Sequence, residues 1–303
     1  MSGSRVVLIT GVTGFIGQNL YHLMKETSPN LKLKFISSKK KSDPHTLSYQ
    51  DFKLETNNAD FFEDITDVVH LAAIAHQPDF DDEKVLKEIN VQYPLELLEK
   101  LKKEKLQNFI FMSSIGVSLL EKDIILDTAR YAQSKKDAED AISSVANEYP
   151  ESSLYMLRSP MVYGQGAPGN FARLIKLLKL PVILPFGSFH FSRPHIHIKN
   201  LCSIICYLIG KEERIHGWQV LEVEDPFQVS LSQFMRELKL KTRGIALILN
   251  FPISLVRFGL SLLGRKNVYK KLSLEFKVDN ESKERNLKNW VPPVSRKDLF
   301  QDL

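Results

Sequence analysis

The sequence predicts an α/β protein with a doubly wound parallel sheet and a smaller, discontinuous C-terminal lobe. Two observations predict this fold class. Short apolar strand patterns alternate with amphipathic helical patterns through the first half of the 303 residues, and this regularity ends near Gly164. Alternation of this kind is typical of parallel strands joined by right-handed helical crossovers.

Each expected strand is a short apolar run rich in β-branched or aromatic residues, as in a sheet that is covered on both faces. These runs are 5–10, 33–36, 66–71, 108–113 and 153–158. Helical patterns cover 82–103 and 130–148, whereas the pattern between 37 and 65 is poor. The first half is therefore expected to form most of the sheet.

Glycine and proline interrupt the pattern between Gly164 and Gly187. The runs 194–198 and 218–223 are expected to return to the sheet. These boundaries predict one domain made of 1–165 and 190–225, and a lobe made of 166–189 and 226–303.

Composition and charge are those of an ordinary globular protein, with a net charge of +5 spread along the chain. Without a basic arm, nucleic-acid binding is disfavoured and an anionic small molecule is the better partner. Cys202 and Cys206 lack the further ligands of a zinc site, so no metal is predicted. The start of the chain has no signal-peptide pattern, which favours a cytoplasmic location.

The most apolar stretch, 244–264, is long enough to raise the question of a membrane span. Asn250, Pro252 and Arg257 interrupt it, so we expect no transmembrane helix but an amphipathic helix from about Pro252 that covers the lobe. Contact with a membrane interface stays open.

Gly11, Gly14 and Gly17 lie between the first strand and the first helix. Glycines at this position permit a tight turn and let backbone N–H groups approach a pyrophosphate at the helix N-terminus. A turn without a ligand is the alternative. Tyr131 and Lys135 are four residues apart on a helix, so an ammonium can lie beside the phenol and favour the phenolate. A surface pair is the alternative for these two residues.

With His70–Ala73 closing a strand, Asn90, and Ser113–Ser114 ending the next strand, these motifs resemble the extended short-chain dehydrogenase/reductases, which have a Rossmann-type fold. The resemblance covers about the first 165 residues. It implies a cofactor, NADP or NAD, lined by Gly11, Thr13, Gly14, Phe15, Ile16, Gly17, Leu71, Ala72, Ala73, Asn90, Tyr131 and Lys135.

The same resemblance implies the catalytic roles. Tyr131 would transfer a proton, Lys135 would contact the nicotinamide ribose, and Ser114 would hydrogen-bond the substrate oxygen, while Ser113 finishes the strand. Ile115 and Gly116 stand where sugar dehydratases of the family carry acidic residues. Elimination of water is disfavoured because a second acid/base is missing there.

Three later segments, 157–164, 169–174 and 193–198, resemble nucleotide-sugar-binding segments of bacterial UDP-sugar 4-epimerases and of 4-keto-reductases acting on UDP-N-acetylhexosamines. Asn170 would contact the nucleotide or diphosphate, and Arg193 the diphosphate. A helix cap and a solvated surface arginine are the alternatives. Met161 departs from the family pattern, since many epimerases have asparagine there.

The end of the second strand reads Ser37, Ser38, Lys39 and Lys40 rather than the carboxylate usual in NAD enzymes. This favours NADP, because hydroxyl and ammonium groups can bind a 2′-phosphate, although such lysines are often simply solvated.

The sequence alone favours, by a small margin, a UDP-4-keto-sugar reductase, with polysaccharide biosynthesis as its setting. The close alternative is a UDP-sugar 4-epimerase that keeps NAD bound. A non-catalytic dinucleotide sensor and a steroid or flavonoid-like reductase are further alternatives, and a homodimer is left open.

Overall fold

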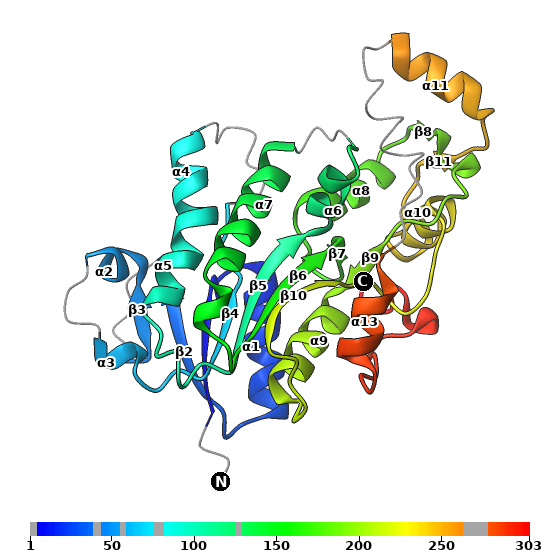
Figure 1. The fold of residues 1–303 in the computed structure, drawn as a ribbon. Helices are drawn as coiled ribbons and strands as arrows, with labels where there is room; N and C mark the ends of the chain where they lie inside the picture. The colour runs from blue at the N-terminus through cyan, green and yellow to red at the C-terminus, as the bar shows by residue number, and fades with distance from the viewer. Residues whose placement is uncertain (1–4, 39–43, 55–58, 75–81, 125–128, 263–277) are drawn as a thin grey trace.

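The computed structural model describes residues 5–38, 44–54, 59–74, 82–124, 129–262 and 278–303. Its centre is a seven-stranded parallel sheet of order β3-β2-β1-β4-β5-β6-β10 (Figure 1). The strands are β1 Val6–Thr10, β2 Lys32–Ser37, β3 Thr46–Ser48, β4 Asp67–His70, β5 Asn108–Ser114, β6 Ser153–Ser159 and β10 Gly217–Glu222. The strand order reverses between β1 and β4, where doubly wound folds bind their ligands.

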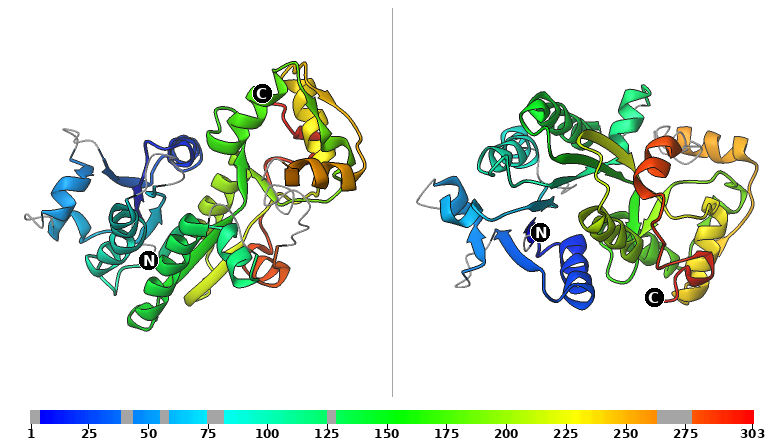
Figure 2. Two further views of the ribbon diagram at one scale, coloured as in Figure 1. Left: turned by 90° about the horizontal axis from the view of Figure 1, so that it is seen from above. Right: turned by 60° about the horizontal axis from the view of Figure 1, so that its bottom comes forward.

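Helices cover both faces of the sheet, as predicted (Figure 2). On one face, Leu20 of α1 (Phe15–Thr27) and Leu201 of α9 (Ile198–Gly210) belong to the same buried cluster. On the other face, Leu97 of α5 (Tyr93–Glu99) packs with Ile142 of α7 (Ala129–Ser144). Beside the β2–β3 edge lie the short helices α2 Tyr49–Lys53 and α3 Ala59–Phe62, and the turn η2 Ala146–Glu148 follows α7.

The predicted helix 82–103 is not continuous. It consists of α4 Glu83–Lys87, a π-helical turn Glu88–Gln92, and α5. Pro94 has no N–H to donate to the carbonyl of Asn90, so the regular helical bond cannot form at this point. The wider turn is the kind of irregularity that often marks functional sites.

The predicted return of 194–198 to the main sheet is wrong. Strand β9 (His195–His197) pairs with β7 (Met161–Tyr163) in a separate two-stranded sheet. Pro160 separates β6 from β7, and a proline cannot donate a ladder hydrogen bond. The chain therefore leaves the main sheet after β6, and only β10 rejoins it.

The lobe has its own aromatic core, in which Tyr163, Phe171, Phe234 and Phe300 contact one another. Its elements are α8 Gly169–Leu178, β8 Ile183–Leu184, η3 Pro185–Ser188, α10 Leu231–Lys241, β11 Leu247–Ile248, α11 Ile253–Leu262 and η4 Arg296–Asp298. Helix α13 (Asn280–Leu287) belongs with the sheet instead, because Ser282 bonds the carbonyl of Val220 in β10.

A buried carboxylate joins the lobe to the sheet. Asp225 accepts hydrogen bonds from the Tyr163 hydroxyl at 2.7 Å, the His197 amide at 3.0 Å and the Asn200 side chain at 2.7 Å. Asn200 also bonds Val294 near the C-terminus. Segments far apart in the sequence are thus held at one point.

The predicted helix after Pro252 is confirmed as α11, and one side of it is apolar and exposed. Val256 is buried, whereas Leu255, Phe258 and Leu262 are exposed. Within the part of the chain that the structure describes, every helix is too short or too polar to cross a membrane.

Candidate active site

The glycine turn between β1 and α1 brings backbone N–H groups to the sheet crevice. Gly11 has φ of +71°, and a Cβ there would lie 2.7 Å from the amide nitrogen of Ala72. A Cβ on Gly17 would lie 2.4 Å from the carbonyl oxygen of Gly11. Gly14 is the N-cap of α1 and makes no side-chain cap, so the first turn is open to an anion.

The chain after β4 forms the other wall of this crevice. Thr10 Oγ1 accepts the amide N–H of Ala72 at 3.1 Å and lies 3.1 Å from His70 Nδ1. Burial lowers the pKa of His70 to about 3, so its imidazole is neutral. Leu71, Ala72 and Ala73 are only half-buried and border the crevice where a dinucleotide would lie.

Strand β5 directs its last two serines to opposite sides. Ser113 is buried and donates a hydrogen bond to Glu139. Ser114 is half-buried, and its oxygen accepts the amide N–H of Gly116 as the cap of helix α6 (Ile115–Glu121). The hydroxyl proton of Ser114 can thus be donated to a bound oxygen, whereas that of Ser113 is used by Glu139.

Ser114 lies close to the helix that carries Tyr131. A Cβ added to Gly116 would lie 3.3 Å from Ser114 Oγ and 3.1 Å from the Cβ of Ala132. Gly116 lies in the first turn of α6, and its lack of a side chain lets α6 pack closely against α7 beside Ser114. The sequence indicated only that an acid is missing at this position, not that the space is needed.

Burial dominates the electrostatics of Tyr131 and Lys135. It raises the pKa of the Tyr131 phenol to about 12 and lowers the pKa of the Lys135 ammonium to about 7. Lys135 donates to the carbonyl of Met112 at 2.8 Å and lies over the Phe111 ring. The shift of the Tyr131 pKa is therefore opposite in direction to the lowering expected from a neighbouring lysine, and its cause is desolvation.

Asn90 was expected among the cofactor contacts, but its side chain is fully buried in protein bonds. Its amide oxygen accepts the N–H of Ile74 at 2.8 Å, and its amide nitrogen donates to Ile74 and to Ser134. Asn90 therefore lies behind the crevice and joins the segment after β4 to α7. Asn90 is the buried residue of the π-helical turn.

A buried ionic group behind the site, formed by Arg158 and two glutamates, was not predicted from the sequence. Arg158 of β6 is almost fully buried and pairs with Glu139 and Glu121, each at 2.6 Å. Glu139 is one helical turn beyond Lys135 and also accepts the Ser113 hydroxyl. No local spacing relates a strand arginine to a helix glutamate, so the sequence carried no signal for this pair.

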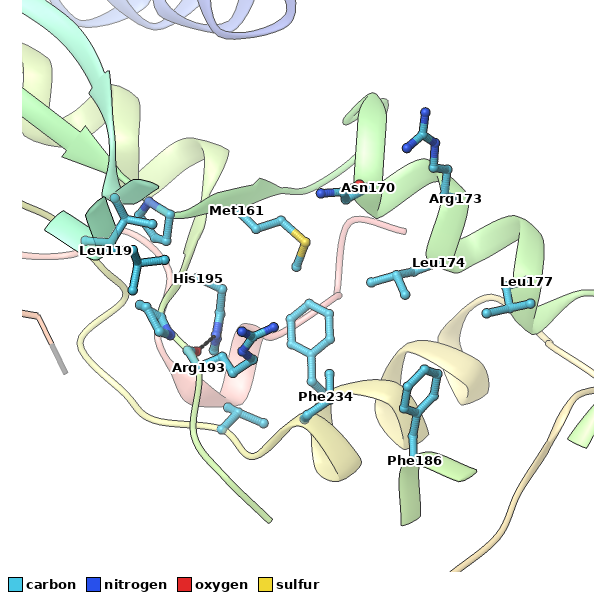
Figure 3. Close-up of a pocket in the computed structure, with 15 residues that line it drawn as sticks. Leu119, Met161, Asn170, Arg173, Leu174, Leu177, Phe186, Arg193, His195 and Phe234 are labelled. Atoms are coloured by element: carbon cyan, nitrogen blue, oxygen red, sulfur yellow. Dashed lines mark hydrogen bonds between the residues drawn. The ribbon is translucent and has the colours of Figure 1, made fainter. Parts of the chain in front are cut away.

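A cavity of about 400 Å³ opens between the end of the sheet and the lobe (Figure 3). It brings Asn170 of α8 and Arg193 together although they come from different segments. Ile115, the neighbour of Ser114, lines the same cavity, so the cavity adjoins the catalytic candidates. Figure 3 shows Asn170 and Met161 facing the cavity, and Arg173 of α8 is also one of the residues that line it.

Most of the cavity wall is apolar. Leu174, Leu177, Phe186 and Phe234 belong to it, and desolvation lowers the pKa of Arg193 there. The sequence did not single out His195, which also lines the cavity. Its Nδ1 lies 2.9 Å from the Arg193 carbonyl and can donate to it, while burial lowers its pKa.

Residues 7–221 match the NAD dependent epimerase/dehydratase family. The match spans both walls of the crevice, the Tyr131 helix and most of the sheet. The chain belongs to the NAD dependent epimerase/dehydratase family. It is therefore an enzyme of the extended short-chain dehydrogenase/reductase type, as the resemblance implied.

Members of this family are similar to the chain over nearly its whole length. A UDP-glucose 4-epimerase of Vibrio cholerae is 28% identical over 97% of the chain and 93% of that protein. The structure of UDP-glucuronic acid 4-epimerase from Bacillus cereus with UDP-glucuronic acid and NAD is 20% identical, with a TM-score of 0.69 over 98% and 97% of the two chains. Human epimerase family protein SDR39U1 with NADPH is 16% identical, with a TM-score of 0.71 over 99% and 100%.

The family's dinucleotide fits the crevice. Glycine at 11 and 17 lets the turn close against neighbouring backbone that a Cβ would strike, and the first turn of α1 is left without a side-chain cap, so its N–H groups can receive a phosphate. At the end of β2, the structure describes two of the residues that are predicted to favour NADP over NAD. Ser37 is buried and pairs in register with Ser48 of β3, and Ser38 is exposed. Lys39 lies outside the described residues.

Proposed function

We propose that this enzyme is a UDP-sugar 4-epimerase that keeps NAD bound through the reaction cycle. The observation that carries the proposal is the cavity that Asn170 and Arg193 line together with Ile115, the neighbour of Ser114. The reductase favoured by the sequence uses the same residues, but the similar 4-epimerases support the epimerase better.

The glycine turn would hold the pyrophosphate through the open first turn of α1, with Leu71, Ala72 and Ala73 along the dinucleotide. When bound, NAD supplies the hydride acceptor and donor for C4 of the sugar. The protein's part is to align C4, to exclude water and to move the hydroxyl proton.

Tyr131 would exchange the proton of the C4 hydroxyl, and Ser114 would donate a hydrogen bond to the same oxygen. With a pKa near 12, the Tyr131 phenol is a poor base in the free chain. The positive charge of the bound oxidised nicotinamide and of Lys135 would lower that pKa toward the working range. Lys135 would contact the ribose, and Asn90 would position α7 through Ser134.

Arg193 would bind the diphosphate, where a planar guanidinium matches two phosphate oxygens. Asn170 would contact the nucleotide or diphosphate from the start of α8. The apolar wall around Phe234 lowers the local dielectric, which strengthens this ionic contact.

Mass spectrometry of the dinucleotide retained after purification tests the proposal, together with turnover of UDP-glucose, UDP-N-acetylglucosamine and UDP-glucuronic acid without added cofactor. We expect bound NAD and conversion to the C4 epimer. A requirement for stoichiometric NADPH, with reduction of a 4-keto sugar, would instead establish the reductase.

A Ser37→Asp variant tests which dinucleotide the end of β2 prefers. A carboxylate there should strengthen the binding of NAD, because it accepts the ribose hydroxyls, and should weaken the binding of NADP, because it repels the 2′-phosphate. Ser48→Asp, at the paired position of β3, serves as the control for a new charge at this edge.

A further inference from the structure

The outer face of the lobe is apolar where a soluble surface is normally polar. Leu247 of β11 pairs with Ile183 of β8, and the two side chains are 53% and 57% exposed. Ile245 and Leu249 are exposed on the same side of the segment, whereas Ala246 between them is buried. A strand with one solvated face usually directs polar residues to water. In this segment, by contrast, both the buried side and the exposed side are apolar.

Helix α11 carries a second exposed apolar side. Leu255, Phe258 and Leu262 are exposed, and their spacing of three and four residues places them on one side of the helix. Figure 1 shows α11 at the outer end of the lobe, beside β8 and β11. We call this surface the apolar platform: Ile183, Ile245, Leu247, Leu249, Leu255, Phe258 and Leu262.

The segments that carry the apolar platform are positively charged. The sequence from 152 to 211 and from 238 to 274 contains lysines and arginines but no aspartate or glutamate. The exposed basic residues on the described part of these segments include Lys176, Lys179, Lys241, Arg243 and Arg257. None of these five forms an ion pair with a carboxylate among the residues that the structure describes.

We propose that the apolar platform docks onto an anionic lipid bilayer. The exposed leucines and phenylalanine would enter the interface, and the cations on the same segments would meet lipid phosphates. At about 1.5 Å per residue, α11 spans roughly half of the hydrocarbon core, so it lies along the surface rather than crossing it.

Charge favours a bilayer over a second copy of the chain. In a two-fold dimer built on this face, the same patch would meet itself and bring the cations of both copies together. An anionic surface neutralises them instead. The segment around β8 contributes both to the apolar platform and to the cavity wall. Leu177 and Phe186, which line the cavity, come before and after β8 in the chain. The sugar would then be handled close to the membrane, whichever reaction the enzyme performs.

Vesicle flotation of the full chain tests the proposal. We expect binding to vesicles of phosphatidylcholine mixed with phosphatidylglycerol, weaker binding to phosphatidylcholine alone, and release as salt increases. Leu255→Asp with Phe258→Asp should reduce binding about tenfold or more, because two apolar side chains leave the interface and two negative charges enter it.

Leu54→Asp is the matched control, since Leu54 is 67% exposed on the sheet domain and far from the lobe in the fold. It should bind vesicles as the parent does, and both variants should keep the parent's circular dichroism. Failure of the parent to bind anionic vesicles, or an equal loss in the control, would overturn the proposal. Light scattering measures the oligomeric state of the parent and of the double variant. If the parent is an oligomer that does not bind vesicles, and the double variant is a monomer, the apolar platform is a protein interface instead.

Discussion

The crevice at the sheet and the outer face of the lobe are built in opposite ways. At the crevice, buried side chains such as Asn90 and Lys135 are hydrogen-bonded to neighbouring segments, and Gly11 and Gly17 stand where a methyl group would clash. On the outer lobe, large apolar side chains face outward with little packed against them. The difference indicates what constrains the sequence in each region. At the crevice it is close packing and hydrogen bonding, and on the outer lobe it is the apolar character of the exposed surface. Small changes should therefore be costly in the first region and nearly silent for folding in the second.

The largest expected effect is on stability behind the crevice. Arg158→Met would leave Glu139 buried without its cation, which should cost about 3–5 kcal/mol of unfolding free energy. Lys136→Met removes an exposed pair with Asp140 on the same helix and should cost less than about 1 kcal/mol. Urea unfolding compares the two; similar losses would show that the buried pair is not special.

Tyr131→Phe should lower the chemical rate about a hundredfold or more, equivalent to roughly 2.7 kcal/mol, through loss of the proton-transfer group. The retained dinucleotide should be unchanged, which separates chemistry from binding. Stopped assays of C4 epimer formation measure the rate. Turnover at the parent's rate would remove Tyr131 from the mechanism.

Two glycines sharpen the comparison inside the crevice. Gly17→Ala places a methyl group 2.4 Å from the Gly11 carbonyl, and overpacking of this kind typically costs about 1–3 kcal/mol. Gly14→Ala meets only that same oxygen, at 3.3 Å, and should change stability by less than about 1 kcal/mol. Calorimetric titration with dinucleotide should show the larger loss of affinity for Gly17→Ala. The reverse ranking would contradict the packing argument.

Lys135 predicts a pH dependence. Because its pKa falls from 10.5 to about 7 on folding, the unfolded chain holds a proton that the folded chain lacks between these values. Stability should therefore rise with pH from about 7 to 10, by up to roughly 1.4 kcal/mol per unit, and be independent of this group below 7. Lys135→Met should remove that slope in urea unfolding of the dinucleotide-free protein. An identical slope in both proteins would show that Lys135 stays charged.

The smallest effect is expected at the lobe. Leu247→Gln should change the unfolding free energy by less than about 0.5 kcal/mol, because the side chain is half exposed and outside the buried core. A loss above 1 kcal/mol by the same urea measurement would show that the outer face is packed after all.

Local spacing decided what the sequence could predict. The glycine turn, the Tyr131–Lys135 pair and six of the seven sheet strands follow from neighbouring residues, and Asn170 and Arg193 do line one cavity. Strand β3 has only three residues and gave too little pattern. The pairing of Arg158 with Glu139, the burial of Asn90 and the exposure of α11 depend on contacts between distant segments, which no local pattern contains.

The late position of α9 in the chain has a consequence for biosynthesis. Leu201, Ile204 and Leu208 of α9 cover the same sheet face as Val7 and Ile110. While the ribosome is still making the first lobe segment, that face has only α1 to shield it. The nascent chain therefore exposes an apolar surface until α9 has emerged, and this interval is when it would recruit a chaperone or aggregate.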